Sequence, residues 1–156
     1  MGLQGGGRRA PPTPCIPPEP TAAAIWDRIF RPSCALSSCH GTATHANLDL
    51  SSLEASCAAL IEQPSCELPT RTRVIPGDPD DSLLLQKLVC VQLPQVDCTP
   101  ALGEIDPACP GTGANHSNLR MPFNNPPLPA CLVESIRTWI LLGAPGCPQT
   151  ATDAGP

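Results

Sequence analysis

The chain has 156 residues, a length that fits one domain, and its composition excludes several kinds of protein. The net charge is −5 and only nine residues are basic, so nucleic acid is not an expected partner. Proline contributes 22 residues, glycine 12 and aromatic side chains only 3%, so the chain cannot build a core on aromatic bulk. Because it also contains ten cysteines, we expect disulfides or a cofactor to stabilise the fold.

The cysteine content also bears on the compartment. Disulfides persist where the environment is oxidising, so we predict an exported protein that is periplasmic or extracellular. Residues 1–10 include two arginines, but the apolar run of an export signal does not follow them. The start then lies upstream or a signal has been removed, and an unseen upstream segment could carry a lipid anchor. No stretch has the length of a transmembrane segment.

Composition divides the chain into three parts. Residues 1–20 are rich in glycine and proline and are predicted to be a flexible leader. Residues 21–147 are predicted to form the single domain, and residues 148–156 a flexible tail.

The first predicted helix runs from Thr21 to Pro32. Thr21 is a favourable N-cap, and Ile25 and Ile29 lie four residues apart on one helical face. Pro32 is expected to end the helix because proline lacks the backbone N–H.

Three further helices are predicted after this one. One spans about residues 52–61 and is capped by Ser51. The next begins at Asp78, which precedes a proline suited to the first helical position. The last covers residues 129–142, with Gly143 just beyond its end. Between these two helices, residues 90–118 lack periodicity and are predicted to form a long loop held by disulfides.

Two cysteines followed at once by a histidine form the pattern that carries chemistry. They are Cys34, Cys39 and His40, with Gly41 next in sequence. In c-type haem attachment, two thiols add to the porphyrin vinyl groups and the adjoining histidine binds the iron. The spacer here has four residues where the common form has two. The residues leave two alternatives open: a local disulfide between Cys34 and Cys39, and a zinc site completed by a fourth ligand.

A methionine supplies the candidate for the second axial ligand. Met121 is the only methionine besides the initiator, and it stands before Pro122 and shortly before the last helix. A thioether binds the far face of the iron in many cytochromes c. The alternatives are a methionine that simply packs in a loop, or His45 or His116 as the ligand.

Together these segments resemble the class I cytochrome c family, especially the single-haem domains of exported bacterial proteins and lipoproteins. The resemblance covers residues 22–144 and rests on the order of five features. They are the helix reaching Ile29-Phe30, the cluster Cys34 to Gly41, the segment Val74 to Pro79, Met121-Pro122, and the final helix to Gly143-Ala144.

The resemblance implies an all-α fold, a cytochrome c-like small helical domain around one covalently bound haem, with long disulfide-stapled loops. The first and last helices would pack together. Haem c would be attached to Cys34 and Cys39, and its iron bound by His40 and Met121.

The function implied by the resemblance is electron transfer to or from a redox partner protein, not catalysis. The domain could also be the electron-transfer subunit of an oxidoreductase. The alternative function is a haem-free, disulfide-stapled extracellular module that binds another protein. In either case the eight other cysteines suit four disulfides, with Cys57 and Cys66 as one local pair.

Overall fold

The computed structural model describes three stretches of the chain, residues 14–90, 98–110 and 118–148. Most of the predicted leader, most of the predicted tail, His116 and much of the predicted long loop lie outside these residues.

A nearly continuous helix follows Thr21 and is divided into α1 (Ala22–Ile25), η1 (Trp26–Phe30) and α2 (Arg31–Ser33). Thr21 is its N-cap as predicted, because its hydroxyl accepts the Ala24 N–H at 3.3 Å. Pro32 does not end the helix, however. The preceding turn η1 is a π-helix in which the Arg31 N–H bonds to the Trp26 carbonyl. This wider turn moves the earlier carbonyls away from the proline ring, so the helix continues through it.

The remaining helices are η2 (His45–Asn47), α3 (Leu53–Leu60), α4 (Leu83–Val89), α5 (Thr99–Leu102) and α6 (Ala130–Leu141). The cap of α3 is Ser52 and not Ser51 as predicted, since the Ser52 hydroxyl accepts the Ala55 N–H at 3.0 Å. Helix α6 matches its prediction within one residue at each end. Gly143 beyond it has a φ of 85°, the left-handed conformation that ends many helices.

Helix α4 begins later than predicted. The Asp78 carboxylate accepts the Asp81 N–H at 3.1 Å, so Asp78 caps a turn and not the helix itself. The Ser82 hydroxyl then donates to the Asp78 carbonyl at 2.7 Å and accepts the Ile75 N–H at 2.8 Å. These bonds satisfy the turn locally, and the helix starts only at Leu83.

The predicted all-α, cytochrome c-like domain is wrong as a description of this fold. The longest helix, α6, has 12 residues, and long irregular segments separate short helices. Isolated β-bridges join Ile61 to Val74 and Pro64 to Thr72. The architecture is therefore mixed and irregular, and four disulfides hold it. The physical reason is the proline and glycine content, which interrupts both helices and sheets before they grow long.

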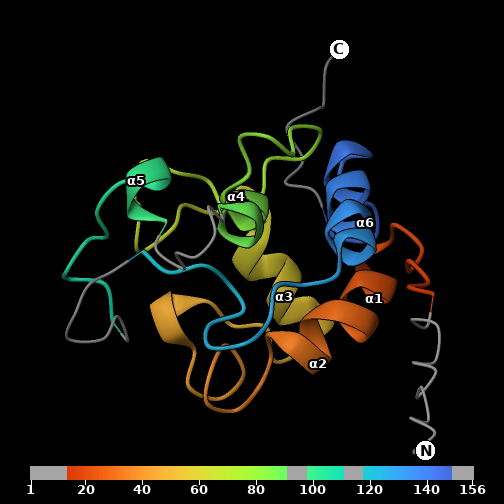
Figure 1. Cartoon of the computed structure of the whole chain (residues 1–156), viewed down its shortest axis with the longest axis horizontal. Helices are drawn as coiled ribbons and strands as arrows, with labels where there is room; N and C mark the ends of the chain where they lie inside the picture. The colour runs from red at the N-terminus through yellow and green to blue at the C-terminus, as the bar shows by residue number, and fades with distance from the viewer. Residues whose placement is uncertain (1–13, 91–97, 111–117, 149–156) are drawn as a thin grey trace, which may run out of the picture.

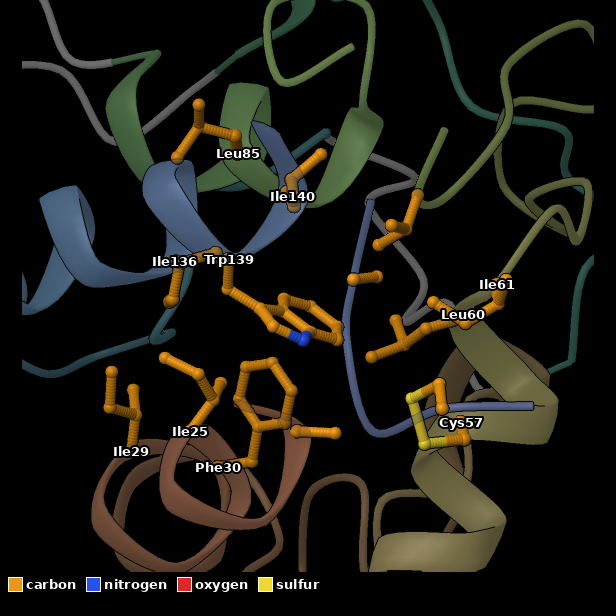
Figure 2. Packing of buried hydrophobic residues seen from close by; sticks show 14 of the residues in the cluster. Ile25, Ile29, Phe30, Cys57, Leu60, Ile61, Leu85, Ile136, Trp139 and Ile140 are labelled. Atoms are coloured by element: carbon orange, nitrogen blue, oxygen red, sulfur yellow. A yellow bond between two sulfur atoms is a disulfide. The ribbon is translucent and has the colours of Figure 1, made fainter. Parts of the chain in front are cut away.

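The hydrophobic core lies where the N-terminal helix, α3, α4 and α6 meet (Figure 1, Figure 2). Trp139 lies at its centre, almost fully buried, with its ring edge-on to Phe30 at 6.3 Å between centroids. The Trp139 indole N–H donates to the Pro145 carbonyl at 3.2 Å, so its one polar group is satisfied. Aliphatic side chains fill the space around this aromatic pair: Ile25, Ile29, Leu60, Leu85, Ile136 and Ile140. Side chains from these four helical segments thus form a continuous hydrophobic core.

Eight of the ten cysteines form four disulfides, as predicted, and the pairs are Cys15–Cys131, Cys57–Cys147, Cys66–Cys109 and Cys90–Cys98. The predicted local pair of Cys57 with Cys66 is wrong. Cys57 is buried in the core against the segment that follows α6, so its partner is Cys147, 90 residues away. Disulfides persist in oxidising surroundings, so this chain is suited to an oxidising compartment. In the described parts of the chain, no helix has the length and apolar character of a membrane span.

We expect the packing of α6 in the core to contribute to the free energy of unfolding. Replacing Ile136, which is fully buried, with alanine should lower the free energy of unfolding by about 2–5 kcal/mol, because it leaves a cavity. Leu141→Ala is the matched control, since Leu141 lies on the same helix but is 58% exposed. That change should stay within about 0.5 kcal/mol. Urea unfolding with the disulfides intact measures both, and equal losses would contradict the core described here.

Candidate functional site

A cavity of about 510 Å³ adjoins the core. Its size is within the range of roughly 300–1,000 Å³ that is usual for small-molecule and cofactor sites. All four residues predicted to bind a cofactor line it, namely Cys34, Cys39, His40 and Met121. Much of the remaining wall is aliphatic and consists of Leu48, Leu50, Leu60, Leu83, Leu84 and Leu88. The structure therefore brings together residues that are up to 87 positions apart in the sequence.

The four-residue spacer folds into a compact turn that returns the second cysteine to the first. Cys34 follows the end of α2, and its N–H bonds to the Phe30 carbonyl at 2.8 Å. The Cys39 N–H then bonds to the Leu36 carbonyl at 2.9 Å, and the His40 N–H to the Cys34 carbonyl at 3.1 Å. The longer spacer thus still places both thiols and the imidazole on one cavity wall.

Gly41 is required by this turn. A Cβ atom on Gly41 would lie 2.5 Å from the Ala35 carbonyl oxygen and 3.0 Å from that of Leu36. Both atoms belong to the backbone and cannot move aside cheaply. The close approach also lets the Gly41 N–H bond to the Leu36 carbonyl at 3.0 Å, which closes the turn.

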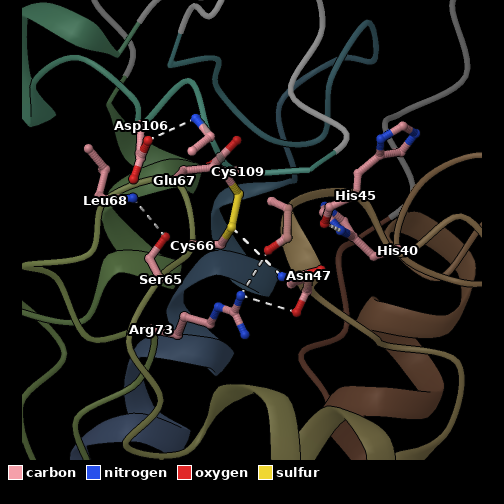
Figure 3. The surroundings of a disulfide bond; sticks show 12 residues. His40, His45, Asn47, Ser65, Cys66, Glu67, Leu68, Arg73, Asp106 and Cys109 are labelled. Atoms are coloured by element: carbon pink, nitrogen blue, oxygen red, sulfur yellow. Dashed lines mark hydrogen bonds between the residues drawn. A yellow bond between two sulfur atoms is a disulfide. The ribbon is translucent and has the colours of Figure 1, made fainter.

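The His40 ring is oriented by a backbone carbonyl. Its Nδ1 lies 3.1 Å from the His45 carbonyl oxygen (Figure 3). Since a carbonyl only accepts, Nδ1 carries the hydrogen and Nε2 keeps its lone pair. Burial lowers the pKa of His40, an effect that the hydrogen bond to His45 partly opposes. The neutral imidazole is thereby favoured, and this is the form that binds a metal.

Cys34 and Cys39 are the two cysteines that take no part in a disulfide. Part of Cys34 is exposed, yet protein atoms surround its thiol. Desolvation, with repulsion from Cys39 added, raises the pKa of Cys34 to about 12. Cys34 therefore stays protonated near neutral pH, which disfavours a role as a zinc thiolate. The structure does not contain the local disulfide between the two that the sequence left open.

Met121 reaches the same cavity from the segment before α6. Its N–H bonds to the Lys87 carbonyl at 3.0 Å, which ties this segment to α4. The Met121 side chain is partly buried and packs against the core. His45, one of the alternative ligands, also lines the cavity, whereas His116 lies outside the described residues.

Charged side chains on the cavity wall were missed by the sequence analysis. The Lys87 ammonium lies 3.0 Å from the Glu67 carboxylate and donates to the Asn118 amide oxygen at 2.6 Å. Lys87 is buried, as is Asn118. The one available signal was a lysine inside the apolar run of α4. Glu67 and Arg73, which also lie on the wall, gave no such signal because neither interrupts the apolar run of a helix.

A zinc site gains no support from the geometry. Across the described residues, no group of three or more histidine, cysteine, aspartate or glutamate side chains gathers closely enough to hold a metal ion. A histidine and a methionine that bind iron within a porphyrin do not need such a group.

No protein-family model, curated protein or solved structure matches this chain. The function is therefore inferred from the side chains at the cavity.

The thiol chemistry can be checked on the haem-free chain. With disulfides intact and the chain unfolded, thiol titration should find two free thiols, and peptide mapping should assign them to Cys34 and Cys39. In the folded chain at about pH 8, iodoacetamide should modify Cys34 more than roughly tenfold slower than in the unfolded chain, because its raised pKa leaves little thiolate. The rate should climb with pH toward the raised pKa. Equal rates in the folded and unfolded chain would contradict a buried Cys34 thiol.

Proposed function

We propose that this protein is an electron carrier with one covalently attached c-type haem. In this proposal Cys34 and Cys39 form the thioether bonds, and His40 and Met121 are the axial ligands. One observation carries the proposal: these four residues line a single cavity, while every other cysteine is used in a disulfide.

The chemistry of the cavity wall fits this group. A porphyrin has broad apolar faces, and the leucine-rich wall offers apolar surface to cover them. A haem also carries two carboxylates, and Lys87 and Arg73 bring positive charge to the same wall. The Glu67 carboxylate compensates one of these charges, which leaves an excess of one positive charge among the three.

The residues of the chain define what the bound group can do. A haem iron supplies one-electron oxidation and reduction when it is bound. His40 presents a neutral nitrogen and Met121 a thioether, a soft ligand that favours the reduced metal. Because His40 and Met121 would both bind the iron, no position on the iron would be left for a substrate, which favours a carrier over an enzyme.

The surroundings of the protein follow from the same proposal. Four disulfides favour an oxidising compartment, so we place the carrier in the periplasm or outside the cell. Its partner is then another redox protein, which it meets either as a free carrier or as the electron-transfer subunit of an oxidoreductase.

Covalent attachment is tested by mass. Protein exported from a cell able to attach c-type haem should weigh more than the bare chain by one haem, and acid should not extract that haem. The double variant Cys34→Ser, Cys39→Ser is the control and should carry no covalent haem. If the wild-type mass equals the polypeptide with a fifth disulfide between Cys34 and Cys39, the haem-free binding module replaces this proposal.

The axial role of Met121 is tested with a substitution that keeps its size. Met121→Leu should leave the haem covalently bound but remove the sulfur ligand. The oxidised protein should then lose its far-red sulfur-to-iron absorption band, its reduction potential should fall and cyanide should bind faster. Leu119→Ala is the control, because Leu119 lines the same cavity from the same segment without a ligating atom. An unchanged spectrum in Met121→Leu would reassign the ligand, and His45 and His116 would be replaced next.

A further inference from the structure

The loop of residues 44–47, which follows the turn from Cys34 to Gly41, has an unusual backbone. Thr44, Ala46 and Asn47 have φ values of 45°, 58° and 52°, in the left-handed region that side-chain-bearing residues seldom adopt. Such conformations persist only where the surroundings impose them, and they cluster at functional sites. This loop contains η2 and includes His45, whose carbonyl oxygen accepts from the His40 ring.

Contacts from several segments impose this conformation. The His45 N–H bonds to the Cys39 carbonyl at 3.1 Å, and the Ala46 N–H to the Pro110 carbonyl at 3.0 Å. Pro110 follows Cys109, which is disulfide-bonded to Cys66 (Figure 3). The amide groups of the loop are thus held by the haem-attachment turn on one side and by a disulfide-linked segment on the other.

Arg73 holds the carbonyl groups of the loop. Its Nη2 donates to the Ala46 carbonyl at 2.9 Å and to the Asn47 carbonyl at 3.2 Å, and its Nη1 donates to the Ala59 carbonyl in α3 at 2.9 Å. The backbone of Arg73 is itself fixed, since its N–H bonds to the Gln63 carbonyl at 2.8 Å. A planar guanidinium can join three carbonyls of two segments at once, which the point charge of a lysine does less well.

We propose that Arg73 is a positioning residue for His40. By fixing the two peptide groups after His45, Arg73 holds the His45 carbonyl where the His40 Nδ1–H meets it, and so fixes the orientation of an imidazole that lines the cavity. The inference rests on the proposed function for its purpose, because a fixed imidazole orientation matters when Nε2 binds iron. The link from Arg73 to the His40 ring exists in the polypeptide itself and can be tested there.

The first test uses the full-length, haem-free chain with its disulfides formed. Nitrogen chemical shifts of the His40 ring, at about pH 8, report which ring nitrogen carries the hydrogen. The wild-type chain should have the Nδ1–H tautomer, and Arg73→Gln should lower the ratio of the Nδ1–H to the Nε2–H form by roughly tenfold. Arg71→Gln is the matched control: it makes the same change of charge two residues away, where the guanidinium contacts Gln86 and not the loop. It should leave the ratio unchanged.

The second test uses the haem-loaded protein. Arg73→Gln should broaden the ferric electron paramagnetic resonance signal, because the imidazole plane no longer has one orientation, and should shift the reduction potential. Arg73→Lys keeps the positive charge but makes fewer hydrogen bonds, so its signal width and reduction potential should lie between those of the wild type and of Arg73→Gln. Arg71→Gln should match the wild type in both. If Arg73→Gln does not fold, Arg73→Lys replaces it in both tests.

The outcomes separate this inference from the proposed function. An Nε2–H tautomer in the wild-type chain, or an unchanged tautomer ratio in folded Arg73→Gln or Arg73→Lys, would overturn the role of Arg73. A wild-type mass without haem would overturn the proposed function, while the tautomer measurement would still decide whether Arg73 orients His40.

Discussion

Three of the four disulfides join cysteines that are 43, 90 and 116 residues apart, and these cross-links are the constraint on which the rest of the structure depends. A chain with 22 prolines and 12 glycines cannot hold itself together by long helical or sheet ladders. Long-range cross-links reduce the entropy of the unfolded chain, and each can stabilise the fold by about 2–4 kcal/mol. They allow short helices and irregular segments to keep fixed relative positions.

The cross-links and the core act on different parts of the molecule. Cys57–Cys147 reinforces the packing around Trp139, because it joins α3 to the segment that follows α6 (Figure 2). Cys66–Cys109 lies away from that packing, beside the loop that orients His40 (Figure 3). Cys66–Cys109 therefore cross-links two irregular segments that lie outside the hydrophobic core around Trp139. In this protein the candidate site is built on irregular backbone, and the cross-link gives that backbone the rigidity that a site requires.

The wall of the cavity also carries a buried ion pair. Lys87 is buried and its charge is compensated by Glu67 and by the Asn118 amide, so the ion pair is satisfied within the protein. Breaking such a pair by removing one partner leaves an uncompensated charge and is strongly destabilising. Charged groups on a largely aliphatic wall suit a ligand that is mostly apolar but carries acidic groups. This property agrees with the proposed haem without depending on the resemblance of the sequence to a family.

The sequence alone determined the features that depend on local chemistry. Residue type and spacing were enough to predict the Thr21 cap, the extent of α6 and the turn at Gly143. They also distinguished Cys34 and Cys39, which precede a histidine, from the other cysteines. Only the tertiary structure decided the pairing of Cys57 with Cys147, the position of Arg73 against the His45 loop, and the irregular architecture that replaces the expected all-α domain. Those features depend on which distant segments meet. Contacts of that kind depend on how distant segments pack and cross-link, and no local pattern records them.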